Sequence, residues 1–322
     1  MTEKSADGAD SADDARELAG LLAAGERAAF HGRPASGVGP LTLAVEAAAG
    51  ANLEGEAMAA GWLLGVCLGA SGRYGGALAV LDPMVTSATT PEGRVLGALA
   101  AATVASIHRQ LGRHSVAQGY DEMAVESSGG EGEAGFDGVL GLAADAVGLG
   151  QADAAVARLD EAAGLAEGRA DWWRQRVRLG WVRAEVALLQ DAPEHAVAAA
   201  GAAVELAEHS GAPRHVAKGL LFLGVAHLEA GRTSEATATL RRAALLAESL
   251  GTLPLQWPVR AVLGALLAGT DDAESERCLG AARHAAREIA ADLPDGLRAE
   301  WLARPDVDTL LQSGGSGGSG RD

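Results

Sequence analysis

Apolar residues along this chain recur at helical spacing on either side of short turns. One stretch carries Trp62, Leu63 and Val66 before a glycine, and Leu78 and Leu81 after it. Apolar residues three and four positions apart form one stripe of a helix. The pattern therefore predicts a helix, a tight turn and a second helix, and we find no stretch with the strict alternation that is typical of a strand.

This helical hairpin recurs with a period near 40 residues. Turn-forming residues mark each period, at spacings of 38 to 41: Gly32, Gly72, Gly112, Gly150, Asp191, Gly231 and Asp271. A glycine there adopts the left-handed conformation that ends a helix at little cost. Repeats of this length are the signature of a solenoid, in which each unit packs on its neighbours. The sequence thus predicts an all-α solenoid of about seven hairpins.

The composition indicates how these helices pack. Aromatic residues make up only 3% of the 322 residues, while glycine alone contributes 44. Small residues stand seven positions before each turn marker: Gly25, Gly65, Ala105, Ala143, Ala184, Gly224 and Gly264. Small side chains let two helix axes approach toward the short end of the usual distances. We expect these positions to lie where the two helices of a hairpin cross.

Two of the units resemble the tetratricopeptide repeat family. The matching residues are Leu64-Gly65, Leu68, Gly72, Tyr74, Ala77 and Leu81 in one unit, and Leu223-Gly224, Gly231, Ala236 and Leu240 in another. The period exceeds the usual 34 residues of that family, and Leu or Ala stands at most of its aromatic positions. The longer unit is similar to the helical-repeat arms that follow ATPase modules in large bacterial transcription regulators.

The resemblance implies a right-handed α-α superhelix over residues 13–312, in which the first helix of each hairpin lines a concave groove that binds proteins or peptides. Near the end, Pro294 and Pro305 begin two short helices. Their apolar residues Trp301, Val307 and Leu310, with Leu302, are expected to cap the solenoid. We expect residues 1–12, an acidic tail, and residues 313–322, a Gly/Ser-rich tail, to be disordered.

The charge excludes some classes of partner. The formal net charge is −17, so the chain is repelled by nucleic acid and by anionic membrane surfaces. Apolar runs are too short to span a bilayer, and no secretory signal is visible. We therefore expect a cytoplasmic protein. The only two cysteines, Cys67 and Cys278, lie within apolar stretches and are expected to be buried.

Motifs for catalysis or cofactor binding are missing. The sequence has no phosphate loop, dinucleotide fingerprint or zinc motif, and we expect no enzyme, cofactor or metal. His209 and His215 flank a turn, but no further ligand stands at a suitable spacing. Three adjacent carboxylate pairs diverge around their helices and are interpreted as solvated surface: Asp121-Glu122, Asp160-Glu161 and Asp271-Asp272.

One segment, residues 169–185, combines five arginines with three tryptophans in a chain that is otherwise acidic and poor in aromatics. By the repeat register it includes the first helix of the fifth hairpin. The predicted partner-binding residues are Arg174, Arg178, Trp181, Glu185 and Leu188 on one stripe, joined by Lys218 and Leu221 from the next hairpin. Arg and Trp are enriched at interface hot spots.

An alternative for this segment is that Trp172 and Trp173 are core and that the arginines offset neighbouring acids. Trp62 with Val66 is a second, weaker candidate for the groove. We hypothesise that the protein is an interaction scaffold or adaptor, with a regulatory role, that binds a protein or peptide in its groove. Two alternatives stay open: a ligand-sensing arm of a transcriptional regulator, and an all-α enzyme or cofactor-binding domain.

Overall fold

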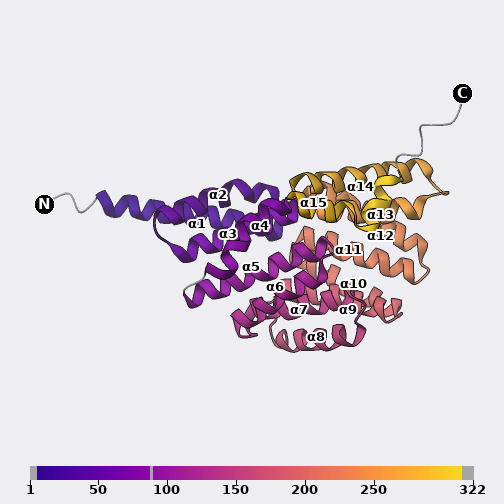
Figure 1. Cartoon of the computed structure of the whole chain (residues 1–322), viewed down its shortest axis with the longest axis horizontal. Helices are drawn as coiled ribbons and strands as arrows, with labels where there is room; N and C mark the ends of the chain where they lie inside the picture. The colour runs from indigo at the N-terminus through magenta and orange to yellow at the C-terminus, as the bar shows by residue number, and fades with distance from the viewer. Residues whose placement is uncertain (1–5, 88–89, 314–322) are drawn as a thin grey trace, which may run out of the picture.

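The computed structural model describes residues 6–87 and 90–313, with side chains from residue 13 onward, and every regular element in those ranges is an α-helix (Figure 1). Fourteen of these helices pair into seven consecutive hairpins, which confirms the predicted solenoid. The pairs are α1 (Ala6–His31) with α2 (Ala35–Gly50), α3 (Glu54–Ser71) with α4 (Tyr74–Ser87), α5 (Pro91–Gln110) with α6 (His114–Ser128), α7 (Gly132–Gly148) with α8 (Ala152–Leu165), α9 (Trp173–Leu189) with α10 (Pro193–His209), α11 (Pro213–Glu229) with α12 (Thr233–Leu250), and α13 (Leu253–Leu267) with α14 (Asp272–Asp292).

Five of the seven predicted turn markers have a left-handed backbone: Gly72, Gly112, Gly150, Asp191 and Gly231. The first and last hairpins differ. Gly32 does not have a positive φ, and in the last hairpin it is Gly269 that takes the left-handed conformation, with φ of 79°. Asp271 instead caps α14, and its side chain accepts a hydrogen bond of 2.9 Å from the backbone N–H of Glu274. Glycine tolerates positive φ, so Gly269 makes the turn that strict periodicity assigned to Asp271. Asp271 begins the next helix instead, because a carboxylate suits a helix N-cap.

Small residues lie at the helix crossings, as predicted. A Cβ atom added to Gly65 would stand 2.4 Å from Cγ of Leu81, and one added to Gly224 would stand 2.7 Å from Cγ of Leu240. Ala105, at the equivalent position in the third hairpin, is fully buried. The first helix of each of these hairpins therefore carries a small residue where its partner helix packs against it.

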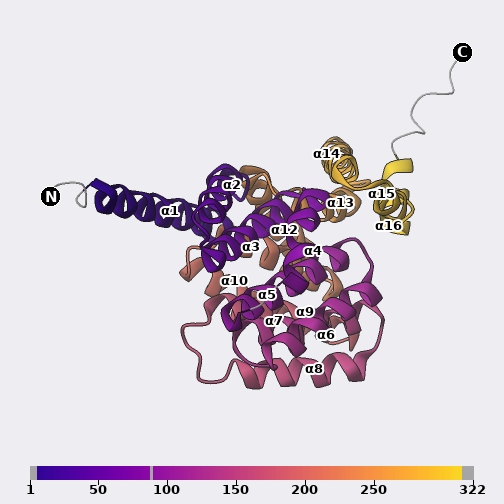
Figure 2. The ribbon, with the colours of Figure 1, turned by 60° about the vertical axis from the view of Figure 1, so that its left-hand side comes forward.

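One boundary was predicted wrongly. The helix α1 begins at Ala6, so residues 6–12 are helical rather than disordered. The segment holds no proline, and its alanines favour helix; Figure 2 shows α1 projecting from the rest of the chain. Residues 1–5 and 314–322 lie outside the described residues. None of the described helices is long and apolar enough to cross a bilayer.

The two closing helices, α15 (Asp295–Leu302) and α16 (Pro305–Gln312), bury three of the four residues predicted to cap the solenoid, and Leu302 is partly buried. Trp301 and Val307 are fully buried, and Leu310 is nearly so. They belong to one apolar cluster that also contains Leu81 of α4 and Ile107 of α5. The C-terminal helices therefore pack against the second and third hairpins, so the superhelix closes on itself (Figure 1).

Polar contacts also join the C-terminal part of the chain to the second and third hairpins. We call the residues that make these contacts the clasp: Ala70, Gly75, Gly76, Gln110, Thr252, Asp292 and Arg304. The Asp292 carboxylate accepts hydrogen bonds of 2.7 and 3.2 Å from the N–H groups of Gly75 and Gly76, in the first turn of α4. The Thr252 hydroxyl donates to the Ala70 carbonyl at 2.7 Å, and Arg304 donates to the Gln110 carbonyl at 2.6 Å. A carboxylate is favoured at a helix N-terminus and a cation at a C-terminus. The clasp thus satisfies helix ends in one half with side chains from the other.

Adjacent glycines allow a matched test of the clasp. A Cβ atom on Gly75 would lie 2.1 Å from the backbone oxygen of Asp292, whereas one on Gly76 would only touch Leu68 at 3.8 Å. We expect Gly75→Ala to destabilise this contact by about 1–3 kcal/mol through overpacking and to speed amide exchange in α14–α16. The control Gly76→Ala should leave exchange unchanged or slower, because Ala favours helix. Equal exchange rates in the two variants would contradict the clasp.

Candidate functional site

The closed superhelix surrounds a cavity of about 130 Å³ on its inner face. Side chains from α1, α3, α5, α7, α9, α11 and α13, the first helices of all seven hairpins, contribute to its lining. A second cavity of about 90 Å³ adjoins it and shares five lining residues: Ser106, Gln110, Arg178, Trp181 and Lys218. As the resemblance implied, the first helices line the concave face. The contact between the two ends reduces this face to a small, partly open cavity in place of a long groove.

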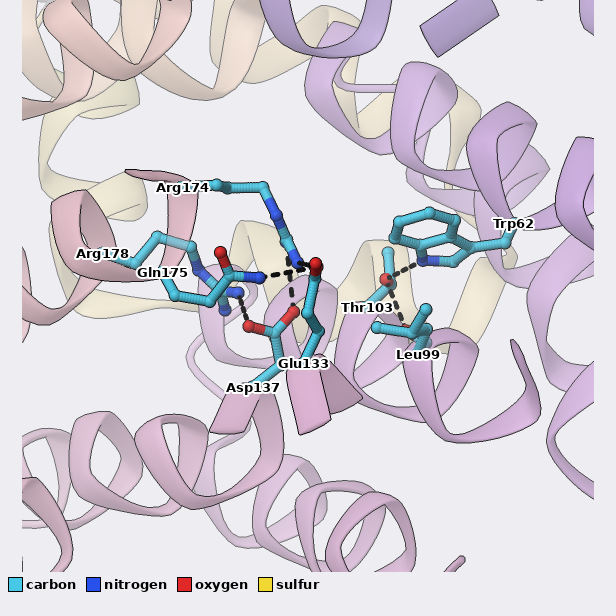
Figure 3. A network of polar contacts seen from close by, with 8 residues as sticks. All are labelled: Trp62, Leu99, Thr103, Glu133, Asp137, Arg174, Gln175 and Arg178. Atoms are coloured by element: carbon cyan, nitrogen blue, oxygen red, sulfur yellow. Dashed lines mark hydrogen bonds and ion pairs between the residues drawn. The ribbon is translucent and has the colours of Figure 1, made fainter. Parts of the chain in front are cut away.

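Arginines of α9 are paired with acids of α7 along one wall of the cavity (Figure 3). Arg174 donates to Asp137 at 3.1 Å and to Glu133 at 2.9 Å. Arg178 pairs with the other oxygen of Asp137, and Gln175 donates to Glu133 at 2.6 Å. Asp137 is only 5% exposed. Two carboxylates thus neutralise and orient two guanidinium groups, as is typical of charge-assisted, forked hydrogen bonds.

A second network lies deeper, between α5, α6 and α7. Arg109 donates to Asp145 at 2.9 Å and also pairs with Asp121, and both carboxylates are fully buried. Burial raises the pKa of Asp121 well above its usual value, although Arg109 opposes the shift. A Cβ atom on Gly141 would stand 2.1 Å from Oδ2 of Asp121, so only glycine there leaves space for the carboxylate.

This network corrects the expectation that Asp121-Glu122 is solvated surface. Glu122 is exposed as expected, whereas Asp121 faces Arg109 in the interior. Adjacent residues point in different directions around a helix, so one of them can face the core. The other two pairs, Asp160-Glu161 and Asp271-Asp272, are exposed as predicted.

Stacked rings form the wall between α9 and α11. Trp181 is 5% exposed and stacks on His215, with ring centroids 5.5 Å apart and planes at 22°. The Nζ atom of Lys218 lies 4.8 Å from the centroid of Trp181, a cation–π contact. Burial lowers the pKa of His215 well below its usual value, so this ring is neutral at pH 7. His209 is exposed, and across the described residues no three His, Cys, Asp or Glu side chains gather as metal ligands.

Most of the predicted partner-binding residues come together here. Arg174, Arg178, Trp181 and Lys218 line the larger cavity, and Glu185 lines the adjoining one. The other two lie elsewhere: Leu188 packs with the small alanine cluster of α9 and α10, and Leu221 packs in the core between α9 and α13. Helical spacing places residues on a stripe about a third of the circumference wide, so its margins face neighbouring helices instead of the cavity.

The weaker candidate, Trp62 with Val66, lines the same cavity from α3. Its indole N–H donates to the Thr103 hydroxyl at 3.1 Å (Figure 3).

The alternative for the arginine segment also holds in part. Trp172 is core and packs edge-on against Phe136, and Trp173 is partly buried. Two of the arginines, Arg174 and Arg178, offset acids of α7.

Sequence reasoning missed Arg109, Asp137 and Arg214 as cavity residues, although the period contains a signal for two of them. Glu133, Arg174 and Arg214 are the second residues of α7, α9 and α11, and Asp137, Arg178 and Lys218 are the sixth. Aligning the first helices by their second and sixth residues would have predicted that the acids of α7 face the arginines of α9. It would also have placed Arg214 beside Lys218 among the predicted site residues.

Two solved structures share this architecture at low sequence identity. A Rap protein complexed with Competence and Sporulation Factor is 13% identical with a TM-score of 0.59, and covers 92% of this chain and 80% of its own. Aspartyl phosphate phosphatase F from Bacillus subtilis is 14% identical with a TM-score of 0.52, and covers 88% of this chain and 78% of its own. These similarities establish a tetratricopeptide-like helical-repeat fold. No protein-family model matches the chain, and no curated protein sequence does.

The buried network around Arg109 predicts a strong dependence on its carboxylates. Asp145→Asn removes a fully buried charge that faces Arg109, and should cost on the order of 3 kcal/mol of unfolding free energy. The exposed Asp160→Asn should change it by less than about 0.5 kcal/mol. Urea denaturation of both variants and the parent measures this difference. Similar stabilities would mean that the network contributes little.

Proposed function

We propose that this chain is a regulatory protein-binding module that holds a short segment of a partner protein on the inner face of the superhelix. The observation that carries the proposal is the concentration of charged and aromatic side chains there. Aromatic residues are 3% of the sequence, yet Phe30, Trp62 and Trp181 all line one cavity together with four cationic side chains. Aromatic and arginine side chains supply most of the binding energy at protein interfaces.

The neighbouring structures support the same class of function. The Rap structure is a complex with Competence and Sporulation Factor, so a superhelix of this architecture takes a binding partner. The net charge of −17 opposes nucleic acid as a ligand here. We also propose that the chain holds its partner without catalysis, because Asp137, the one carboxylate among the described residues that line the larger cavity, is engaged in ion pairs with Arg174 and Arg178.

The cavity's size limits what can bind without a change in the structure. Its volume of about 130 Å³ resembles that of cavities which hold a single small ring, and is well below the roughly 300–1,000 Å³ of typical ligand pockets. One side chain or chain end fits, whereas a helix does not. We propose that a longer segment enters when the clasp opens, so that binding and clasp opening are coupled.

A second candidate is a sensor arm that responds to a small ligand, as the resemblance to the arms of bacterial regulators implies. The small volume of the cavity favours it, because a concave site of about 130 Å³ suits a small molecule better than a broad protein surface.

Capture experiments test the main proposal. With the parent chain as bait in a lysate of the source organism, we expect a recovered partner to be lost with Trp181→Ala. Truncating a central interface Trp typically costs about 2 kcal/mol or more, roughly 30-fold in affinity. Arg178→Glu should act in the same direction, since it places a carboxylate beside Asp137.

The matched control is Arg176→Glu, which makes the same charge change at an exposed position of the same helix. Circular dichroism establishes that each bait is folded. Equal recovery of the same proteins by all four baits would exclude the inner face as the partner's binding surface.

A further inference from the structure

On the inner face, the two cations of α11, Arg214 and Lys218, have no acids at the matching positions of the next first helix, α13. The acids Glu133 and Asp137 of α7 pair with Arg174 and Arg178 of α9. Arg214 and Lys218 hold the same two positions in α11. On the far side of α11, the second and sixth residues of α13 are Pro254 and Pro258. Proline offers no charge, so the next first helix supplies no carboxylate at the matching positions.

Arg214 and Lys218 are correspondingly unpaired within the described part of the chain. The Nε atom of Arg214 is buried and has no hydrogen-bond partner, and no carboxylate forms an ion pair with either side chain. The contacts of Lys218 are with the rings of Trp181 and Phe222, at 4.8 and 5.8 Å. Both cations line the larger cavity, where Asp137 is the only carboxylate.

Desolvation acts strongly on this pair. Burial lowers the pKa of Arg214 to about 10 and that of Lys218 to about 8. The neighbouring cations Arg178 and Arg109 lower the pKa of Lys218 further, and Glu185 opposes them without forming an ion pair. Both side chains are only partly exposed, so an unpaired charge there is costly, and groups with perturbed pKa values cluster at functional sites.

The surrounding polar atoms also lack partners. His215 is 2% exposed with an unpartnered Nδ1, and Trp181 is 5% exposed with an unpartnered Nε1. Buried polar groups in native proteins are nearly always hydrogen-bonded. Three cavity residues (Trp181, Arg214 and His215) therefore each have a buried atom without a hydrogen-bond partner, and Lys218, which forms no ion pair, lines the same cavity.

We propose that Arg214 and Lys218 form an oxyanion site inside the superhelix, which takes a carboxylate or phosphate group of the bound ligand. A guanidinium forks onto two oxygens of such a group, and an ammonium adds a point charge. The oxyanion replaces the acids that α13 lacks. The cavity volume of about 130 Å³ limits the group to one small anion or one acidic chain end.

This inference rests on the proposed function only in making the inner face a binding surface. The same chemistry can come from a free small anion or from an acidic residue of a partner segment, and the probes below separate the two.

Isothermal titration calorimetry tests the site with four probes at matched ionic strength. Glutarate and inorganic phosphate present oxyanions, glutaramide is the neutral analogue of glutarate, and an Ala-rich pentapeptide ending in Glu presents a chain end. We expect at least one anionic probe to bind the parent chain and glutaramide not to bind. Tighter binding of the pentapeptide would identify a partner segment as the source, and tighter binding of a small anion would identify a free ligand.

The variants Arg214→Gln and Lys218→Met should each weaken anion binding by about tenfold or more, because each removes one charge-assisted contact. The exposed Arg176→Gln is the control and should bind like the parent. Without ligand, thermal melts of Lys218→Met should show a midpoint no lower than that of the parent, because an unpaired buried charge is removed and Met keeps the contacts with Trp181.

The pH dependence supplies a second readout. In the protein without ligand the pKa of Lys218 is about 8, and a bound anion raises it. Binding should therefore take up a proton and weaken as the pH rises through 8. Lys218→Met should lose this dependence. Failure of all three anionic probes to bind, or equal binding by the parent and both variants, would overturn the oxyanion site. If anions bind but no partner is captured, the oxyanion site stands and the proposed partner-binding function fails. If a partner is captured equally well by the parent, Arg214→Gln and Lys218→Met, the partner-binding function stands and the oxyanion site fails.

Discussion

Contact between the two ends of the superhelix is the constraint on which the inner site depends. The cluster that holds Trp301 and Val307 with Leu81 and Ile107 buries the cap of the last hairpin on the second and third hairpins. Asp292 then satisfies the first turn of α4, across more than half of the chain. Because the ends meet, the charged side chains of the concave face are only partly exposed, and their charges are screened less than they would be on an open groove.

That enclosure explains how charge is arranged inside. Arginines of α9 and Arg109 of α5 each face carboxylates of α6 or α7, and charge-assisted hydrogen bonds hold each guanidinium in place. Buried ion pairs contribute little net stability, since desolvation offsets their attraction. Their value is geometric: they hold the walls of the cavity in one conformation. Arg214 and Lys218 are not paired with acids in this way, so the inner face keeps positive charge there that a ligand can neutralise.

Much of the fold could be predicted from the pattern, and the failures have physical causes. The positions of Gly65 and Gly224 at helix crossings followed from the period, because packing within a hairpin is local. Asp121 was misplaced, since exposure depends on which helix covers a face, and neither spacing nor residue type reports that. The site was found in part: Arg178, Trp181 and Lys218 stood out by composition, whereas Asp137 is an ordinary acid until α9 lies beside it.

The sequence by itself determined the helices, their hairpin pairing and the small residues that let them pack, because these depend on contacts within about one repeat. Only the tertiary structure decided that the two ends meet and that the concave face becomes a closed, charged interior. Each hairpin adds a small rotation to the next, and closure depends on the sum of these rotations over seven hairpins. No local pattern encodes that sum, so the enclosed cavity and its unpaired cations emerge from the assembled superhelix.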